Sequence, residues 1–359
     1  MNIEAFNLFY SIFYIMLCAV VLPFSLLLER VDASKYIKIS SIVYSIFFII
    51  LIWVLVGFRG IDVGVDTKHY YLYYWLNTNL EYSTELVFPI LISILKYFEL
   101  DYQYFLLTTS FIFYFYLNRI FNKASYLFHA NKLFILFCFF SLFISLSLSI
   151  NIIRQGVSLV FLWYGILSFL ENKNKNKNKF LFFIFLSFLT HSTSIIAIIL
   201  FFFIYFFKRI NLFYFISLYF VGVCIAYLNI GVLNFIGDLV LIEDRRVGYL
   251  TNESMSYEIG FKPQFVLFNT FFLFIFYFIF KYLDFINKDK YLILLKYYII
   301  LSIMFFLCFQ IPYSDRIGLF SWMMLPILMA PCFSSKSKYS FMAIIVMILI
   351  YIGFNIYAK

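Results

Sequence analysis

Three arginines, Arg59, Arg154 and Arg316, stand out because each adjoins long apolar segments. A charged side chain at or inside a bilayer is costly and usually faces a cavity or a partner. Guanidinium groups stay protonated at any physiological pH and bind phosphate through two parallel hydrogen bonds. The arginines therefore indicate a site for a phosphate-containing ligand. The alternative is that each arginine simply snorkels to the membrane interface.

Two further side chains could move a proton. Asp66 follows Arg59 within a short stretch that also contains Gly64 and Tyr70, and His191 interrupts an apolar segment. A carboxylate or an imidazole can accept a proton from an attacking hydroxyl. The alternative for His191 is a structural role in which neighbouring hydroxyl groups satisfy the ring. We find no nucleotide-binding glycine motif and no metal-ligand spacing, so we expect neither cofactor nor metal.

The composition decides what kind of scaffold holds these residues. The chain is 65% hydrophobic and 13% charged, with a mean hydropathy of +0.96. Soluble domains carry about 25% charged residues. Apolar runs of roughly 20 residues recur, and they are continuous rather than alternating, which favours helices over a barrel. We predict an all-α, polytopic transmembrane bundle that forms a single membrane domain over residues 1–359.

About ten to twelve spans are expected from the apolar runs. Two segments are ambiguous. Residues 85–98 are short and flanked by Glu85 and Glu99, which suits a re-entrant or interfacial helix. Residues 180–207 form either one long span with His191 buried or two short helices that meet at His191. The clear runs are 5–28, 39–57, 102–118, 133–149, 152–170, 211–229, 263–281, 291–311, 317–333 and 340–357.

The basic residues indicate orientation. If 85–98 and 180–207 both return to their starting side, one face collects 17 of the 27 lysines and arginines and the other collects 7. The positive-inside rule places the richer face in the cytoplasm. The Asn-Lys repeat at residues 172–179 is expected to be a solvated loop on that face. The loops 59–84 and 231–262, the three arginines and His191 then share the outer face.

The net charge of +9 does not indicate nucleic-acid binding, because the basic residues lie in short loops where membrane topology explains them. We therefore expect the lipid bilayer, and no nucleic acid, as a partner.

The ordered motifs resemble the EpsG/Wzy-like group of bacterial polymerases, which join O-antigen, capsule or exopolysaccharide repeat units. Each motif is only a few residues long, so the resemblance rests on their order across roughly residues 50–330. The matching residues are Phe58-Arg59-Gly60, Gly64-Val65-Asp66, Tyr70, Arg154-Gln155-Gly156, His191-Ser192 and Arg316.

The resemblance implies a metal-independent membrane glycosyltransferase, similar to multi-span enzymes that use lipid-linked donors. Donor and acceptor would be oligosaccharides on undecaprenyl pyrophosphate, joined at the periplasmic face of the bacterial inner membrane. A flippase and a chain-length regulator would be partners. Arg154, His191 and Asp66 would be catalytic, and Arg59, Arg154, Gln155, Arg316 and Tyr70 would bind pyrophosphate or sugar. The alternatives are an O-antigen ligase and a repeat-unit flippase or other transporter.

Overall fold

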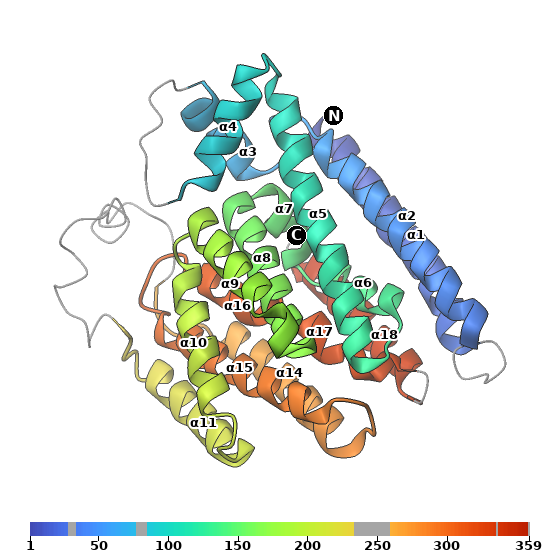
Figure 1. Ribbon diagram of the computed structural model, residues 1–359, viewed down its shortest axis with the longest axis vertical. Coiled ribbons are helices and arrows are strands. Elements are labelled where there is room, and N and C mark those ends of the chain that lie inside the picture. The colour runs from blue at the N-terminus through green and yellow to red at the C-terminus, as the bar shows by residue number, and fades with distance from the viewer. Residues whose placement is uncertain (28–33, 77–84, 233–258, 335–336, 358–359) are drawn as a thin grey trace. The chain divides into compact units, whose positions relative to one another are not determined.

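A computed structural model describes residues 1–27, 34–76, 85–232, 259–334 and 337–357 (Figure 1). These residues are helical, with no strand among them, and they confirm the predicted polytopic, all-α membrane fold. The chain forms two compact units, of which the first holds Met1–Ile198, Leu283–Asn287 and Met329–Lys359, and the second holds Ile199–Tyr282 and Lys288–Leu328. A single membrane domain over 1–359 stays a prediction. Most of the predicted outer loop 231–262 lies outside the described residues.

The first unit contains the helices that carry most of the candidate site residues. They are α1 (Ile3–Leu27), α2 (Ser34–Gly57), α3 (Val65–Tyr70), the π-helical turn η2 (Tyr71–Trp75), α4 (Val87–Tyr97), α5 (Tyr102–Phe128), α6 (Lys132–Phe140), α7 (Ile144–Ile150), α8 (Ile153–Glu171), α9 (Lys173–Thr190), the 3-10 turn η4 (Ala330–Phe333) and α18 (Ser340–Tyr357).

The second unit contains α11 (Leu212–Tyr227), α14 (Pro263–Tyr282), α15 (Lys288–Leu307) and α16 (Asp315–Trp322). Along the chain, α10 (Ser194–Phe206) and α17 (Leu325–Met329) each cross from one unit to the other.

Helix α8 is the most buried candidate span of the first unit, with 94% of its apolar window covered by other parts of the protein. It packs against α5 and α9, and Figure 1 shows these three helices side by side. Small residues allow the close approach to α9, as is usual between helices in a membrane. Ser158 and Ser187 join the two helices through their hydroxyl groups at 2.9 Å, and Gly165 faces Phe183.

Fewer helices have both the length and the apolar composition of a membrane span than the sequence suggested. Six described helices have the length and composition to cross a membrane, or seven if the bent pair α6 and α7 counts as one span. The predicted span 133–149 is this pair, which bends by 80°. Four other apolar helices, α4, α10, α11 and the core of α18, have fewer than 18 residues. The chain is thus a multi-pass membrane protein with several short apolar helices.

Neither ambiguous segment forms a single long span. Helix α4 has 11 residues and rises about 16 Å, which is too short to cross the hydrocarbon core. The segment 180–207 is two helices, because α9 ends at Thr190 and α10 begins at Ser194. His191 lies at the break between them.

The Asn-Lys repeat was predicted to be a loop, and this prediction was wrong. Helix α9 begins at Lys173, and the side chain of Asn172 caps it by accepting a hydrogen bond from the backbone N–H of Lys175 at 3.1 Å. Lysine is a good helix former, and asparagine is a preferred N-cap residue. A single residue therefore separates α8 from α9.

The tight turn before α8 yields a test. A Cβ added at Gly156 would lie 2.0 Å from the carbonyl oxygen of Leu148, which is backbone and cannot swing away. We expect Gly156→Ala to lower the free energy of unfolding by about 1–3 kcal/mol. The melting temperature of the purified protein in detergent measures this. Gly353→Ala is the control, because nothing lies within 4 Å of a Cβ there. Equal melting temperatures for both variants would contradict the crowding at Gly156.

Candidate active site

Glu85 forms the centre of a polar cluster in the first unit. Its Oε2 accepts a hydrogen bond from Nη1 of Arg154 at 2.8 Å. Its Oε1 lies 2.8 Å from Nδ1 of His191 and accepts hydrogen bonds from the backbone N–H and the hydroxyl of Ser192 at 2.9 and 3.0 Å. The carboxylate therefore joins the loop before α4, the first turn of α8 and the break between α9 and α10.

The electrostatics keep this carboxylate ionised. Burial by itself would raise the pKa of Glu85, but the hydrogen bond and charge of His191 and the charge of Arg154 outweigh it and lower the pKa to about 2. Glu85 is therefore negatively charged at any physiological pH. It serves as a hydrogen-bond acceptor and counter-ion, and it is too weak a base to remove a proton from a hydroxyl.

Arg154 is held from two sides. Its Nε donates to the hydroxyl of Tyr70 at 3.2 Å, and its guanidinium lies 5.2 Å from the ring centre of Tyr74. Planar guanidinium groups stack on aromatic rings in this way. The side chain is still 28% exposed, whereas that of Glu85 is 11% exposed. A guanidinium carries five N–H donors, so a pre-oriented cation retains donors for an anionic ligand.

The partner of His191 determines which ring nitrogen carries the proton. An ionised carboxylate can only accept hydrogen bonds, so Nδ1 of His191 must donate to Glu85. In the neutral ring, the lone pair then lies on Nε2, on the side of the ring away from Glu85. A carboxylate that orients a histidine in this manner is a recurring arrangement for general-base catalysis. The His191 side chain is 17% exposed, so a ligand can reach it.

Three other predicted residues, Tyr70, Asp66 and Gln155, lie in the first unit with this cluster. Tyr70 is buried and contacts Arg154 directly. Asp66 lies one helical turn before Tyr70 in α3, near enough for its charge to act on the Tyr70 hydroxyl. Gln155 is buried, and it does not face the same way as Arg154 because consecutive helical residues point in different directions.

Arg316 lies in the second unit at the start of α16, 5.0 Å from the ring centre of Tyr313.

Arg59 is fully buried and holds the backbone of the first unit. Its Nη1 donates to the carbonyl oxygen of Val56 at 2.7 Å, and its Nε donates to the Thr67 hydroxyl at 3.2 Å. Thr67 in turn donates to the carbonyl oxygen of Ile150, at the end of α7. Burial lowers the pKa of Arg59 to about 10, which still leaves it charged at neutral pH. This geometry braces the loop after α2 against the turn that precedes Arg154.

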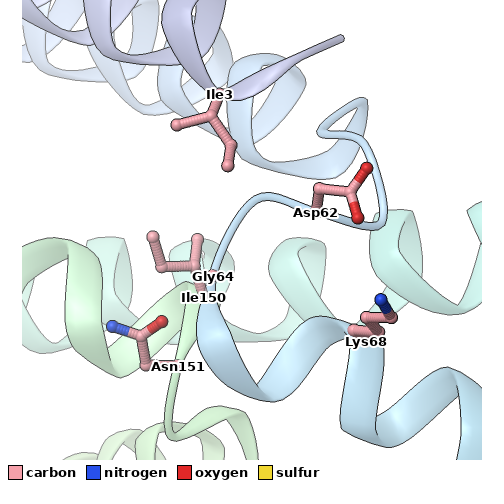
Figure 2. Close-up of a pocket in the computed structure, with 6 residues that line it drawn as sticks. All are labelled: Ile3, Asp62, Gly64, Lys68, Ile150 and Asn151. Atoms are coloured by element: carbon pink, nitrogen blue, oxygen red, sulfur yellow. The ribbon is translucent and has the colours of Figure 1, made fainter.

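A pocket of about 410 Å³ lies beside this brace. Figure 2 shows Asp62 and Lys68 on one side and Ile150 and Asn151 on the other. Gly64 lines it with a φ of +90°, a conformation that favours glycine, and a Cβ there would lie 2.7 Å from the Ile150 carbonyl oxygen. The pocket wall therefore includes Ile150 and Asn151, which lie four and three positions before Arg154.

Sequence reasoning missed Glu85, which it treated only as the polar flank of an apolar run. Glu85 could have been found by the same signal that pointed to Arg154, which is a single charged residue next to an apolar segment. No group of three or more His, Cys, Asp or Glu side chains gathers as a possible metal site in the described part of the chain.

Comparison with known families gives one clear result. A model of the EpsG family matches residues 41–359, a range that contains Arg59, Glu85, Arg154, His191 and Arg316. This agrees with the resemblance seen in the short motifs. Neither curated proteins nor solved structures gave a match.

The low pKa of Glu85 predicts acid sensitivity. A carboxyl whose pKa is lowered by folding contributes stability above its ordinary pKa near 4.5, and this contribution is lost as the pH falls towards 2. We expect Glu85→Gln to lower the free energy of unfolding at pH 7 by about 1–3 kcal/mol. The variant should also lose less stability than wild type between pH 5 and pH 3. Melting temperatures across this range measure both effects. Glu4→Gln, at the exposed start of α1, is the control, and equal acid sensitivity in wild type and Glu85→Gln would contradict the assignment.

Proposed function

The chain belongs to the EpsG family of Wzy-like polysaccharide polymerases, and we propose that it joins lipid-linked oligosaccharide repeat units at the periplasmic face of a bacterial inner membrane. The growing chain on undecaprenyl pyrophosphate is the donor, and a second lipid-linked repeat unit is the acceptor. A hydroxyl of the acceptor attacks the anomeric carbon of the donor. The new glycosidic bond forms as the bond to pyrophosphate breaks, and undecaprenyl pyrophosphate leaves.

The cluster of Glu85, Arg154 and His191 carries this proposal. Breaking the bond to pyrophosphate leaves negative charge on the departing phosphate oxygen, and a fixed guanidinium stabilises charge that develops in the transition state. Arg154 is suited to this role because Tyr70 and Glu85 fix its orientation while part of it stays exposed. No catalytic step in this scheme requires a metal or a cofactor.

His191 is the better supported of the two bases. Its Nδ1 is occupied by Glu85, so Nε2 of the neutral ring accepts the acceptor's hydroxyl proton. Glu85 acts as a positioning residue, because it orients His191 and neutralises the imidazolium that forms. Asp66 remains the alternative base, placed in α3 next to the Arg154 contact residue Tyr70.

The other predicted residues take supporting roles in this scheme. Gln155 orients a phosphate or sugar oxygen, and Tyr70 positions Arg154 as well as lining the site. Arg316, which belongs to the second unit, stays a predicted pyrophosphate ligand. Arg59 braces the loop after α2, in keeping with its buried hydrogen bonds. A flippase that delivers repeat units and a chain-length regulator are the expected protein partners.

Removing Arg154 tests the pyrophosphate role. We expect Arg154→Ala to lower polymerisation by about 10²–10³-fold, because a charge-stabilising donor is lost, and Arg154→Lys to be impaired because a point charge cannot replace a planar fork. The readout is the surface-polysaccharide ladder of the source strain at matched protein abundance. Arg209→Ala, which removes an exposed arginine, is the control.

A collapse of the ladder to single repeat units would support a polymerase. A normal ladder would show that Arg154 has no catalytic role. Complete loss of attached repeats would indicate the ligase or flippase alternative instead.

A mutant cycle separates the two bases and tests the positioning role of Glu85. We expect His191→Gln to lower the turnover of purified enzyme on a lipid-pyrophosphate substrate by about 10²–10⁴-fold, and Asp66→Asn to have a much smaller effect. Glu85→Gln should reduce turnover in wild type and add less than its full effect to His191→Gln, because it acts partly through the histidine and partly through Arg154. Additive losses in the double variant would contradict this. A larger loss from Asp66→Asn would make Asp66 the base.

A further inference from the structure

A second group of cations lies at the other end of α8. Arg154 is in the first turn of this helix and Glu171 is its last residue, so about 26 Å of helix separates them. This length is close to the thickness of the hydrocarbon core. Around the Glu171 end, the structure brings together basic side chains from α5, α6 and α9, none of which takes part in the proposed reaction.

Tyr164 organises this group from within α8. The ammonium group of Lys179 lies 4.5 Å from its ring centre, and that of Lys123 lies 5.4 Å from it. Arg119 lies one helical turn before Lys123 on α5, near enough for its charge to act on the Tyr164 hydroxyl. Lys132, at the start of α6, is only 3% exposed and lies close enough to Arg119 for the two charges to act on each other. Four cations from three helices thus converge.

Within the described part of the chain, the charge of this group is not balanced by carboxylates. Glu171 forms an ion pair with Lys123. Among the described residues, no carboxylate forms an ion pair with Arg119, Lys132 or Lys179. Bringing three like charges together is unfavourable, above all where one of them is buried. An anion from outside the protein would remove this penalty.

We propose that Arg119 and Lys179, supported by the charge of the buried Lys132, bind the phosphate group of an anionic phospholipid at the end of α8 opposite Arg154. Phosphate accepts hydrogen bonds from both guanidinium and ammonium groups, and basic pockets between membrane helices take lipid headgroups of this kind. The face is also the one that the basic loops place in the cytoplasm, where anionic lipids are attracted to basic residues. The proposal stands whether or not the polymerase reaction is correct, because the two sites share no side chain.

The test measures lipid binding to the purified full-length protein. We titrate the protein in detergent with phosphatidylglycerol or phosphatidylcholine of equal chain length and count bound lipid by native mass spectrometry. Each basic residue near a membrane surface is worth about a fivefold change in affinity. We expect Lys179→Gln to weaken phosphatidylglycerol binding about fivefold and Arg119→Gln with Lys179→Gln about 25-fold.

The matched control removes two positive charges elsewhere on α9. Lys175 and Lys177 are exposed on the same helix, so Lys175→Gln with Lys177→Gln should bind phosphatidylglycerol as wild type does. Equal losses in the two double variants would overturn the proposal, because only the general surface charge would then matter. Equal retention of both lipids by wild type would also overturn it. Displacement of phosphatidylglycerol by millimolar inorganic phosphate would assign the site to free phosphate instead of lipid.

Discussion

The ionised carboxylate of Glu85 is the interaction on which the candidate site depends. An isolated charge in a poorly solvated region is costly, so it persists only where partners surround it. Here one carboxylate satisfies Arg154, His191 and Ser192 together, and each of them satisfies it in return. The pairing fixes the relative positions of α8 and the break between α9 and α10, which no apolar contact would do with the same directional precision.

Close packing of small residues supports that pairing. Gly156 lets α8 begin against the carbonyl of Leu148, and Ser158 with Ser187 lets α9 lie directly on α8. These contacts align the two helices so that Arg154 and His191 end up near the same carboxylate. The fully buried Arg59 adds a second brace, because Thr67 links it to the residues just before α8. The geometry of the candidate site thus depends on apolar and backbone contacts made by the same helices.

Continuous apolar runs were enough to predict a helical membrane protein, and isolated charges against them made Arg154 and His191 candidate site residues. Glu85 escaped notice because its role arises only when residues 69 and 106 positions apart meet, which local spacing does not encode. The bend between α6 and α7 was missed because the run 133–149 stays apolar through the break. The helical start of α9 was missed because composition suggested a loop, although Asn172 is a good N-cap and lysine favours helix.

The length of α8 has a consequence for the surrounding bilayer. Most lone spans adjust to a thinner or thicker membrane by tilting or by moving their flanking charges. Helix α8 lacks that freedom, because neighbours cover nearly all of it and polar groups anchor it at both ends. The lipid must therefore deform to match the protein. The bilayer then takes up any mismatch in acyl-chain length, and the geometry of the Glu85 cluster stays the same.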